Sequence, residues 1–205
     1  MVTNKVYVNN KGVGREESLK EIEHFSDNLQ LSRKSRLHLR LLTEEMLGMA
    51  AQIGGAFDAE FWAENEDKTC RLSLEAEIEK MSLQKREELL RSSTSGKNAA
   101  YSGIMDRVRE QMEIYALMME EGVEDSIGID YGVENLIGSA EGLSPKSPRE
   151  WKLSEYKGSL SRQNDSERIA AWDELERSIV ANIADDVSVG VKGETVMLVI
   201  TKTLL

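Results

Sequence analysis

The sequence has little of several features that would identify a class of protein directly. Cysteine occurs once in 205 residues, at Cys70, which excludes an intrachain disulfide framework and a metal site built from several cysteines. Only 2 prolines interrupt a chain that is 40% hydrophobic, so most of it is expected to fold. No apolar run approaches the roughly 18 residues of a membrane span, and residues 1–14 contain none long enough for a signal peptide.

Positive charge is also scarce. The chain has 26 Lys and Arg residues against 37 Asp and Glu residues, a formal net charge of −11. A nucleic-acid surface needs clustered Lys and Arg, so nucleic acid is not expected as a partner. The acidic balance is typical of soluble bacterial proteins. Together with the lack of a membrane span and a signal peptide, it predicts a cytoplasmic protein.

Local catalytic signatures are missing as well. The two histidines, His24 and His38, fall on expected helices without a Cys, Asp or Ser at a telling spacing. The sequence contains no Gly-x-Ser-x-Gly, no HExxH and no Ser-His-Asp signature. The histidines are therefore interpreted as surface or half-buried side chains.

The most informative stretch is an expected helix that begins at an N-cap near Ser32 and ends before the Gly54-Gly55 pair. The three-and-four spacing of its apolar residues predicts one buried face, made of Leu39, Leu42, Met46, Met49, Ala50 and Ile53. Glu44 and Glu45 stand side by side at the edge of this stripe. They are either plain helix-surface carboxylates or members of a site.

Other elements follow from the same periodicities. Strands are expected at 5–9, 59–64 and 72–78, and a closing hairpin at 187–200, because apolar and polar residues alternate there. Helices are expected at 16–30, 98–119 and 166–184, and a further helical stretch follows residue 78. Residues 120–163 show no period and are too many for an ordinary connection, which predicts a lid-like or mobile insertion.

This order of elements predicts an α+β fold in a single domain, residues 1–205. Strands joined by short turns must be antiparallel, so the expected architecture is a two-layer α/β sandwich. Its sheet is mixed and mainly antiparallel, and the helices lie on one face.

The helix with the Glu44-Glu45 pair resembles the first nucleotide-binding helix of the histidine-kinase-like ATPase superfamily, closest to the anti-sigma-factor serine kinases. The family motif is Glu-Glu-Ala-Leu-x-Asn-Ala, and this chain matches its Glu pair, its Leu and its final Ala. The order of elements and the ending 183–204 are similar too. The resemblance implies the histidine-kinase-like ATPase fold, ATP and Mg²⁺ as ligands, Glu45 as general base and Glu44 as its solvated neighbour.

Three departures from the family pattern concern the nucleotide contacts. Met49 stands where the family Asn holds Mg²⁺, and a thioether is too soft and weak a ligand to replace an amide oxygen. The family's Asp-x-Gly-x-Gly signature falls at 76–81, which has neither Asp nor Gly, leaving Glu77 or Glu79 as the available carboxylates. Gly96 and Lys97 precede an expected helix and could cradle phosphate, or they simply end a Ser-rich loop.

The resemblance and its departures together predict a degenerate anti-sigma-kinase-like regulatory protein. It would signal through a protein partner, of the sigma-factor or anti-sigma-antagonist type, with weak or lost ATP binding. The alternative is a functional ATP-binding serine kinase or ATPase that uses Glu45 with non-standard nucleotide contacts. Met118 and Met119, with Tyr115, are either core filler or a helical interface, which is compatible with a homodimer.

Overall fold

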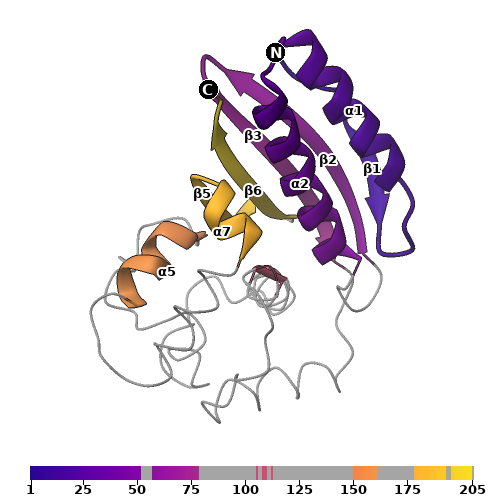
Figure 1. Cartoon of the computed structure of the whole chain (residues 1–205). Helices are drawn as coiled ribbons and strands as arrows, with labels where there is room; N and C mark the ends of the chain where they lie inside the picture. Colours follow the sequence, from indigo (N-terminus) through magenta and orange to yellow (C-terminus); the bar gives the residue numbers. More distant parts are fainter. Residues whose placement is uncertain are drawn as a thin grey trace, which may run out of the picture.

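The computed structural model of the chain (Figure 1) describes residues 1–51, 57–78, 150–160, 178–192 and 195–204, together with Met105, Val108, Arg109 and Met112. Glu79, Gly96 and Lys97 lie outside the described residues, and so do Tyr115, Met118 and Met119, expected as either core filler or a helical interface. Val108 and Met112 are helical and fully buried, as the apolar spacing of the expected helix 98–119 predicts.

One open sheet organises the described part of the chain. Its strands are β1 (Val6–Asn9), β2 (Phe57–Glu66), β3 (Thr69–Ile78), β4 (Glu150–Lys152), β5 (Asp186–Lys192) and β6 (Thr195–Thr203). They lie in the order β1-β2-β3-β6-β5-β4. Every pairing among these described strands is antiparallel, whereas the sequence predicted a mixed, mainly antiparallel sheet. The α+β class is thus confirmed.

The alternation predicted for the strands decides which face of the sheet is buried. Phe61 lies opposite Leu74, which lies opposite Leu198 on β6, so one apolar row crosses three strands. All three side chains are fully buried. The same alternation runs through β1 and β5, whose buried members are Val6, Val8, Val187 and Val189.

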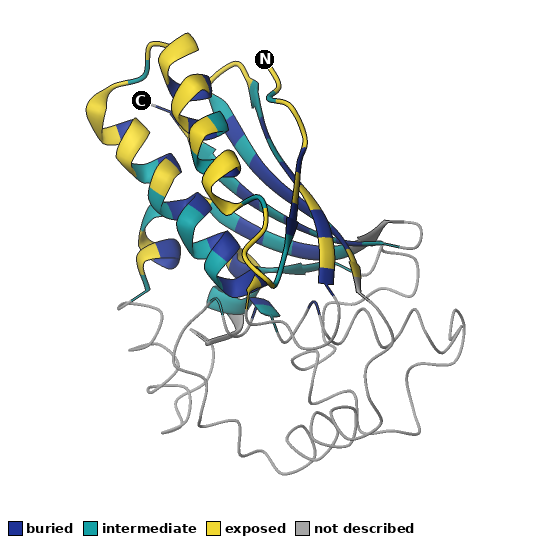
Figure 2. Ribbon diagram, turned by 90° about the vertical axis from the view of Figure 1, so that its right-hand side faces the viewer, coloured by how far each residue is buried: buried dark blue, intermediate teal, exposed yellow. Residues whose placement is uncertain are grey.

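Helices α1 (Arg15–Asn28) and α2 (Arg33–Ala50) cover this apolar face (Figures 1 and 2). Ile22 and Phe25 of α1 and Leu39 and Leu42 of α2 are buried in the shared core. Ser32 is the N-cap of α2, as expected, and its hydroxyl accepts a hydrogen bond from the Ser35 backbone N–H at 3.2 Å. The prediction of helices on one face is confirmed for α1 and α2.

The helix expected at 166–184 does not run through Ser178. That residue has an extended backbone and is the N-cap of α7 (Ile179–Ile183), accepting from the Ala181 N–H at 3.2 Å. The spacing of apolar residues in the expected helix, from Ile169 to Ile183, puts Ile179 on its buried face. Ile179 is nevertheless exposed, and Val180 and Ala181 are buried. Within a continuous helix, the Ala181 N–H would donate to a backbone carbonyl of the preceding turn. A serine hydroxyl can accept that hydrogen bond in place of the carbonyl, so a serine can begin a helix as readily as it continues one.

The structure also differs from the expectation within residues 120–163. The edge strand β4 and the helix α5 (Leu153–Leu160) occupy positions for which no period was evident. β4 has only three residues, too few to display an alternation. α5 follows it directly, and the Asp186 carboxylate accepts hydrogen bonds from the N–H and hydroxyl of Ser154, each at 3.0 Å. These contacts join α5 to a residue of β5 that is distant in the sequence, so no local sequence pattern predicts them.

The side chain of Asp185, the residue before β5, is hydrogen-bonded to two residues of β6. Asp185 accepts hydrogen bonds from the Lys202 ammonium at 2.9 Å and from the Thr203 backbone N–H at 2.5 Å. Partial burial alone would raise the pKa of Asp185. Hydrogen bonds from Thr203 and Lys202 outweigh it and hold the pKa below its ordinary value of 3.8.

Because the folded protein lowers this pKa, the stabilisation by Asp185 is fully present above about pH 4 and is lost as the pH falls through the folded pKa. Asp185→Asn should therefore be less stable than the wild type at pH 7, and the difference should shrink on acidification below pH about 4. Chemical denaturation of both proteins between pH 7 and pH 2 measures this. A difference that stays constant over the whole range would contradict the assignment.

Candidate functional site

The predicted stripe on α2 is buried as a unit. Leu39, Leu42, Met46, Met49 and Ala50 all belong to the core, which confirms the helical period on which the candidate site depends. Ile53 lies outside the described residues. The helix therefore presents its apolar face to the sheet and leaves Glu44 and Glu45 at the border between core and solvent, where both are half-buried.

Glu44 is held in an ion-pair network. Its carboxylate accepts a hydrogen bond from Arg40 Nε at 3.0 Å, one helical turn earlier. The same guanidinium also pairs with Glu23 of α1. Arg40 thus links the two helices, and Glu44 serves this surface contact rather than pointing freely towards a ligand. An exposed network of this kind contributes little to stability.

Glu45 is the residue to which the resemblance assigns the general base. Within the described part of the chain it makes no hydrogen bond or ion pair, so no neighbour fixes its orientation. A general base has to lie within hydrogen-bond reach of the proton that it removes. No hydrogen bond among the described residues joins Glu45 to a second catalytic group, and its assignment stays a prediction.

Met49 stands where the resemblance places a magnesium-binding asparagine, and it is only 3% exposed. Its side chain belongs to the hydrophobic core together with Met46 and Ala50. A thioether among hydrocarbon side chains offers Mg²⁺ neither a hard oxygen ligand nor room for the waters that the ion retains. Position 49 therefore works as a packing position.

Glu77 lies on the opposite side of the sheet from α2. The neighbouring Ala76 is fully buried under the helices, whereas Glu77 is exposed and sits directly across from Asp58 of β2. Side chains of successive strand residues point to opposite faces. Glu77 is thus not brought together with Glu44, Glu45 or Met49, and the sheet itself separates it from them.

The remaining polar candidates, Cys70 and His38, have pKa values that their surroundings shift. Burial raises the pKa of the Cys70 thiol to about 12, so the nucleophilic thiolate is scarce at neutral pH. Burial, and then the positive charges of Lys202 and Lys34, lower the pKa of His38. In the ranges that the structure describes, no group of three or more His, Cys, Asp or Glu side chains could hold a metal ion.

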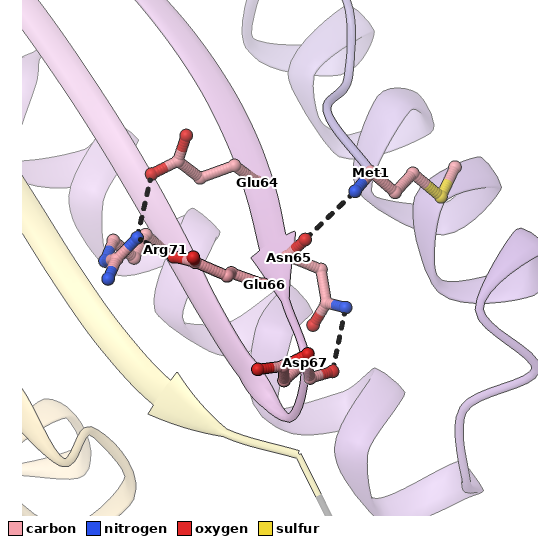
Figure 3. A network of polar contacts seen from close by, with 6 residues as sticks. All are labelled: Met1, Glu64, Asn65, Glu66, Asp67 and Arg71. Atoms are coloured by element: carbon pink, nitrogen blue, oxygen red, sulfur yellow. Dashed lines mark hydrogen bonds and ion pairs between the residues drawn. The ribbon is translucent and has the colours of Figure 1, made fainter.

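A polar network at the β2–β3 turn was not anticipated from the sequence (Figure 3). Arg71 donates to the carboxylates of Glu64 and Glu66, each at 3.3 Å. The amino group of Met1 donates to the backbone carbonyl of Asn65 at 2.9 Å, and the Asn65 side-chain amide donates to the Asp67 carbonyl at 3.1 Å. The network fixes the N-terminal residue to the hairpin, so its role here is structural.

The side of the sheet away from α1 and α2 carries a second group of polar side chains. We call it the open face. Its described residues include Lys5, next to β1, and, on β1, β2, β3 and β6, Tyr7, Asp58, Glu60, Trp62, Glu64, Glu66, Arg71, Ser73, Glu75, Glu77, Met197, Val199 and Thr201. None of the described helices lies over this side of β1, β2 and β3 (Figure 2). The acidic alternation of β3 was visible in the sequence, but the pairing of β3 with β6 was not.

No protein-family model matches the sequence, and neither the curated proteins nor the solved structures gave a match. None of the helices within the described residues is long and apolar enough to cross a membrane.

Proposed function

We propose that this protein is a degenerate relative of the anti-sigma-factor serine kinases, a regulatory protein that binds a protein partner and has lost metal-dependent ATP turnover. The observation that carries the proposal is the burial of Met49 in the hydrophobic core of α2. A protein that used this helix to hold Mg-ATP would need an oxygen ligand at that position and access for the phosphates.

The position of Glu77 supports the same proposal. An adenine site between the helices and the sheet needs its carboxylate on the helix-covered face, and Glu77 is on the other one. Two nucleotide contacts of the family are therefore absent from the described residues. The partner expected from the resemblance is a sigma factor or an antagonist of anti-sigma factors.

Thermal unfolding with Mg-ATP, with ADP and with EDTA tests the loss of nucleotide binding. We expect the same midpoint in all three solutions at millimolar nucleotide, because no described group would bind the metal-phosphate unit. A ligand at 100 times its dissociation constant stabilises by about 2.7 kcal/mol, which would raise the midpoint by on the order of 5–10 °C for a chain of this size. A nucleotide-dependent rise of that order would overturn the proposal.

Glu45→Ala separates the proposal from its alternative, an ATPase or serine kinase with Glu45 as general base. If the wild type hydrolysed ATP and Glu45→Ala bound nucleotide without hydrolysing it, the alternative would hold. Glu44→Ala is the matched control, since it removes a carboxylate from the adjacent position of the same helix. Under the proposal, neither variant differs from the wild type in phosphate release.

A further inference from the structure

The open face combines aromatic and apolar side chains with an excess of carboxylates. Trp62, Ser73 and Val199 form one row across β2, β3 and β6, and Tyr7, Glu60, Glu75 and Met197 form the next row. Trp62, Met197 and Val199 are half-buried, and Tyr7 is 50% exposed. Apolar surface thus stays in contact with solvent along the middle of this face.

Ser73 is buried although it lies on the open face, with only 3% of its surface exposed. The register explains this burial, because Trp62 and Val199 flank the small serine on the two neighbouring strands. The large side chains on both sides thus cover the small serine, and the surface of this row is mainly that of Trp62 and Val199.

Lys5 makes both ion pairs and a cation–π contact on this face. Its ammonium pairs with Glu60 at 2.5 Å and with Glu75 at 3.5 Å, and it lies 4.6 Å from the centre of the Trp62 ring. Cation–π and carboxylate contacts act together on one basic group. The chain's own N-terminal segment therefore demonstrates the chemistry of the face at one edge.

The open face carries a large excess of negative charge. Its carboxylates, Asp58, Glu60, Glu64, Glu66, Glu75 and Glu77, outnumber its basic groups, Lys5 and Arg71. Arg71 is already shared between Glu64 and Glu66. Asp58 and Glu77 lie directly opposite each other, a pairing of like charges that disfavours the free protein.

We propose that the open face binds a basic amphipathic helix of the protein partner. The apolar side of that helix covers Trp62, Val199 and Met197, and its Lys and Arg side chains reach Asp58 and Glu77. The dimensions suit one helix, because four strands about 4.8 Å apart make a face roughly 15 Å wide and a helix is about 10–12 Å in diameter. The inference rests on the proposed partner-binding function and specifies its surface.

A second copy of the chain is a poor occupant of the same face. Two copies related by a two-fold axis would bring the carboxylates of one face against those of the other, and like charges across an interface cost affinity. A basic partner instead relieves the repulsion between Asp58 and Glu77. Charge complementarity therefore favours a partner of opposite sign.

Fluorescence anisotropy with a labelled amphipathic peptide of leucine and lysine, about 18 residues or five turns long, tests the inference. The glutamate counterpart of the same peptide is the chemical control and should not bind. The double variant Asp58→Asn/Glu77→Gln should weaken binding of the lysine peptide by about five-fold or more. The matched variant Glu16→Gln/Glu17→Gln removes the same charge from the exposed first turn of α1 and should change the affinity by less than about two-fold.

Equal weakening by the two double variants would show unspecific attraction to an acidic protein and would overturn the inference. So would self-association, measured by sedimentation, that the Asp58→Asn/Glu77→Gln variant strengthens, because the face would then belong to a second copy. Circular dichroism of each variant checks that the fold is retained. A midpoint shift with Mg-ATP would overturn the proposed function alone, so the two failures are distinguishable.

Discussion

Replacing Leu42 by alanine is expected to lower the free energy of unfolding by about 2–5 kcal/mol, because the side chain is fully buried between α2 and the sheet. The loss combines the transfer of the removed carbons to water with the cavity that remains. For a chain of this size it corresponds to a midpoint lower by on the order of 10 °C. Denaturant titration followed by circular dichroism measures it.

The same helix supplies the control. Leu37 is 54% exposed, five positions earlier on α2, and Leu37→Ala changes the same atoms without opening a cavity. Its effect should stay within about 0.5 kcal/mol. Similar losses for both variants would mean that α2 does not pack through the face that contains Leu42.

The second large effect is expected at Met49. Met49→Asn places an amide in the hydrophobic core, and its lost apolar contacts and unpaired polar atoms should lower the free energy of unfolding by about 2–4 kcal/mol. Met49→Leu keeps the volume and the apolar character, so it should cost less than about 1.5 kcal/mol.

The Met49 pair also bears on function, because asparagine is the residue that the family uses to hold Mg²⁺. Under the proposed function, Met49→Asn gains no ATP turnover, since Glu77, the described carboxylate at the place of the family Asp, lies on the face of the sheet away from α2. Phosphate release with Mg²⁺ and with EDTA is the measurement. Magnesium-dependent turnover in Met49→Asn but not in Met49→Leu would mean that a nucleotide pocket persists, and the proposal would fail.

Local patterns predicted a large part of the fold. The three-and-four spacing on α2 identified its buried residues, and the alternation in β2 and β3 identified the apolar face of the sheet. Both periods are properties of the backbone geometry and need no knowledge of neighbours. The prediction of a continuous helix through Ser178 was wrong. A serine at a helix N-cap and a serine inside a helix can have the same sequence neighbours, so the sequence does not distinguish them.

The candidate site could be predicted only as a set of residues. The sequence placed Glu44, Glu45 and Met49 on one helix, with Met49 in its apolar stripe and the two glutamates at the edge of that stripe. It could not show that Arg40 forms ion pairs with both Glu44 and Glu23 of α1. The Arg40–Glu23 pair joins residues of two different helices, so no local pattern predicts it. Glu79, Gly96 and Lys97 remain predictions outside the described residues.

The sequence by itself determined which side chains of α2, β2 and β3 face the core, because burial in these elements follows a short period along the chain. Only the tertiary structure decided which elements lie side by side. It set Glu77 across from Asp58, Lys5 beside Glu60 and Glu75, and Ser73 between Trp62 and Val199. Strand pairing joins residues that are distant in sequence, and the charge and shape of the open face exist only after that pairing.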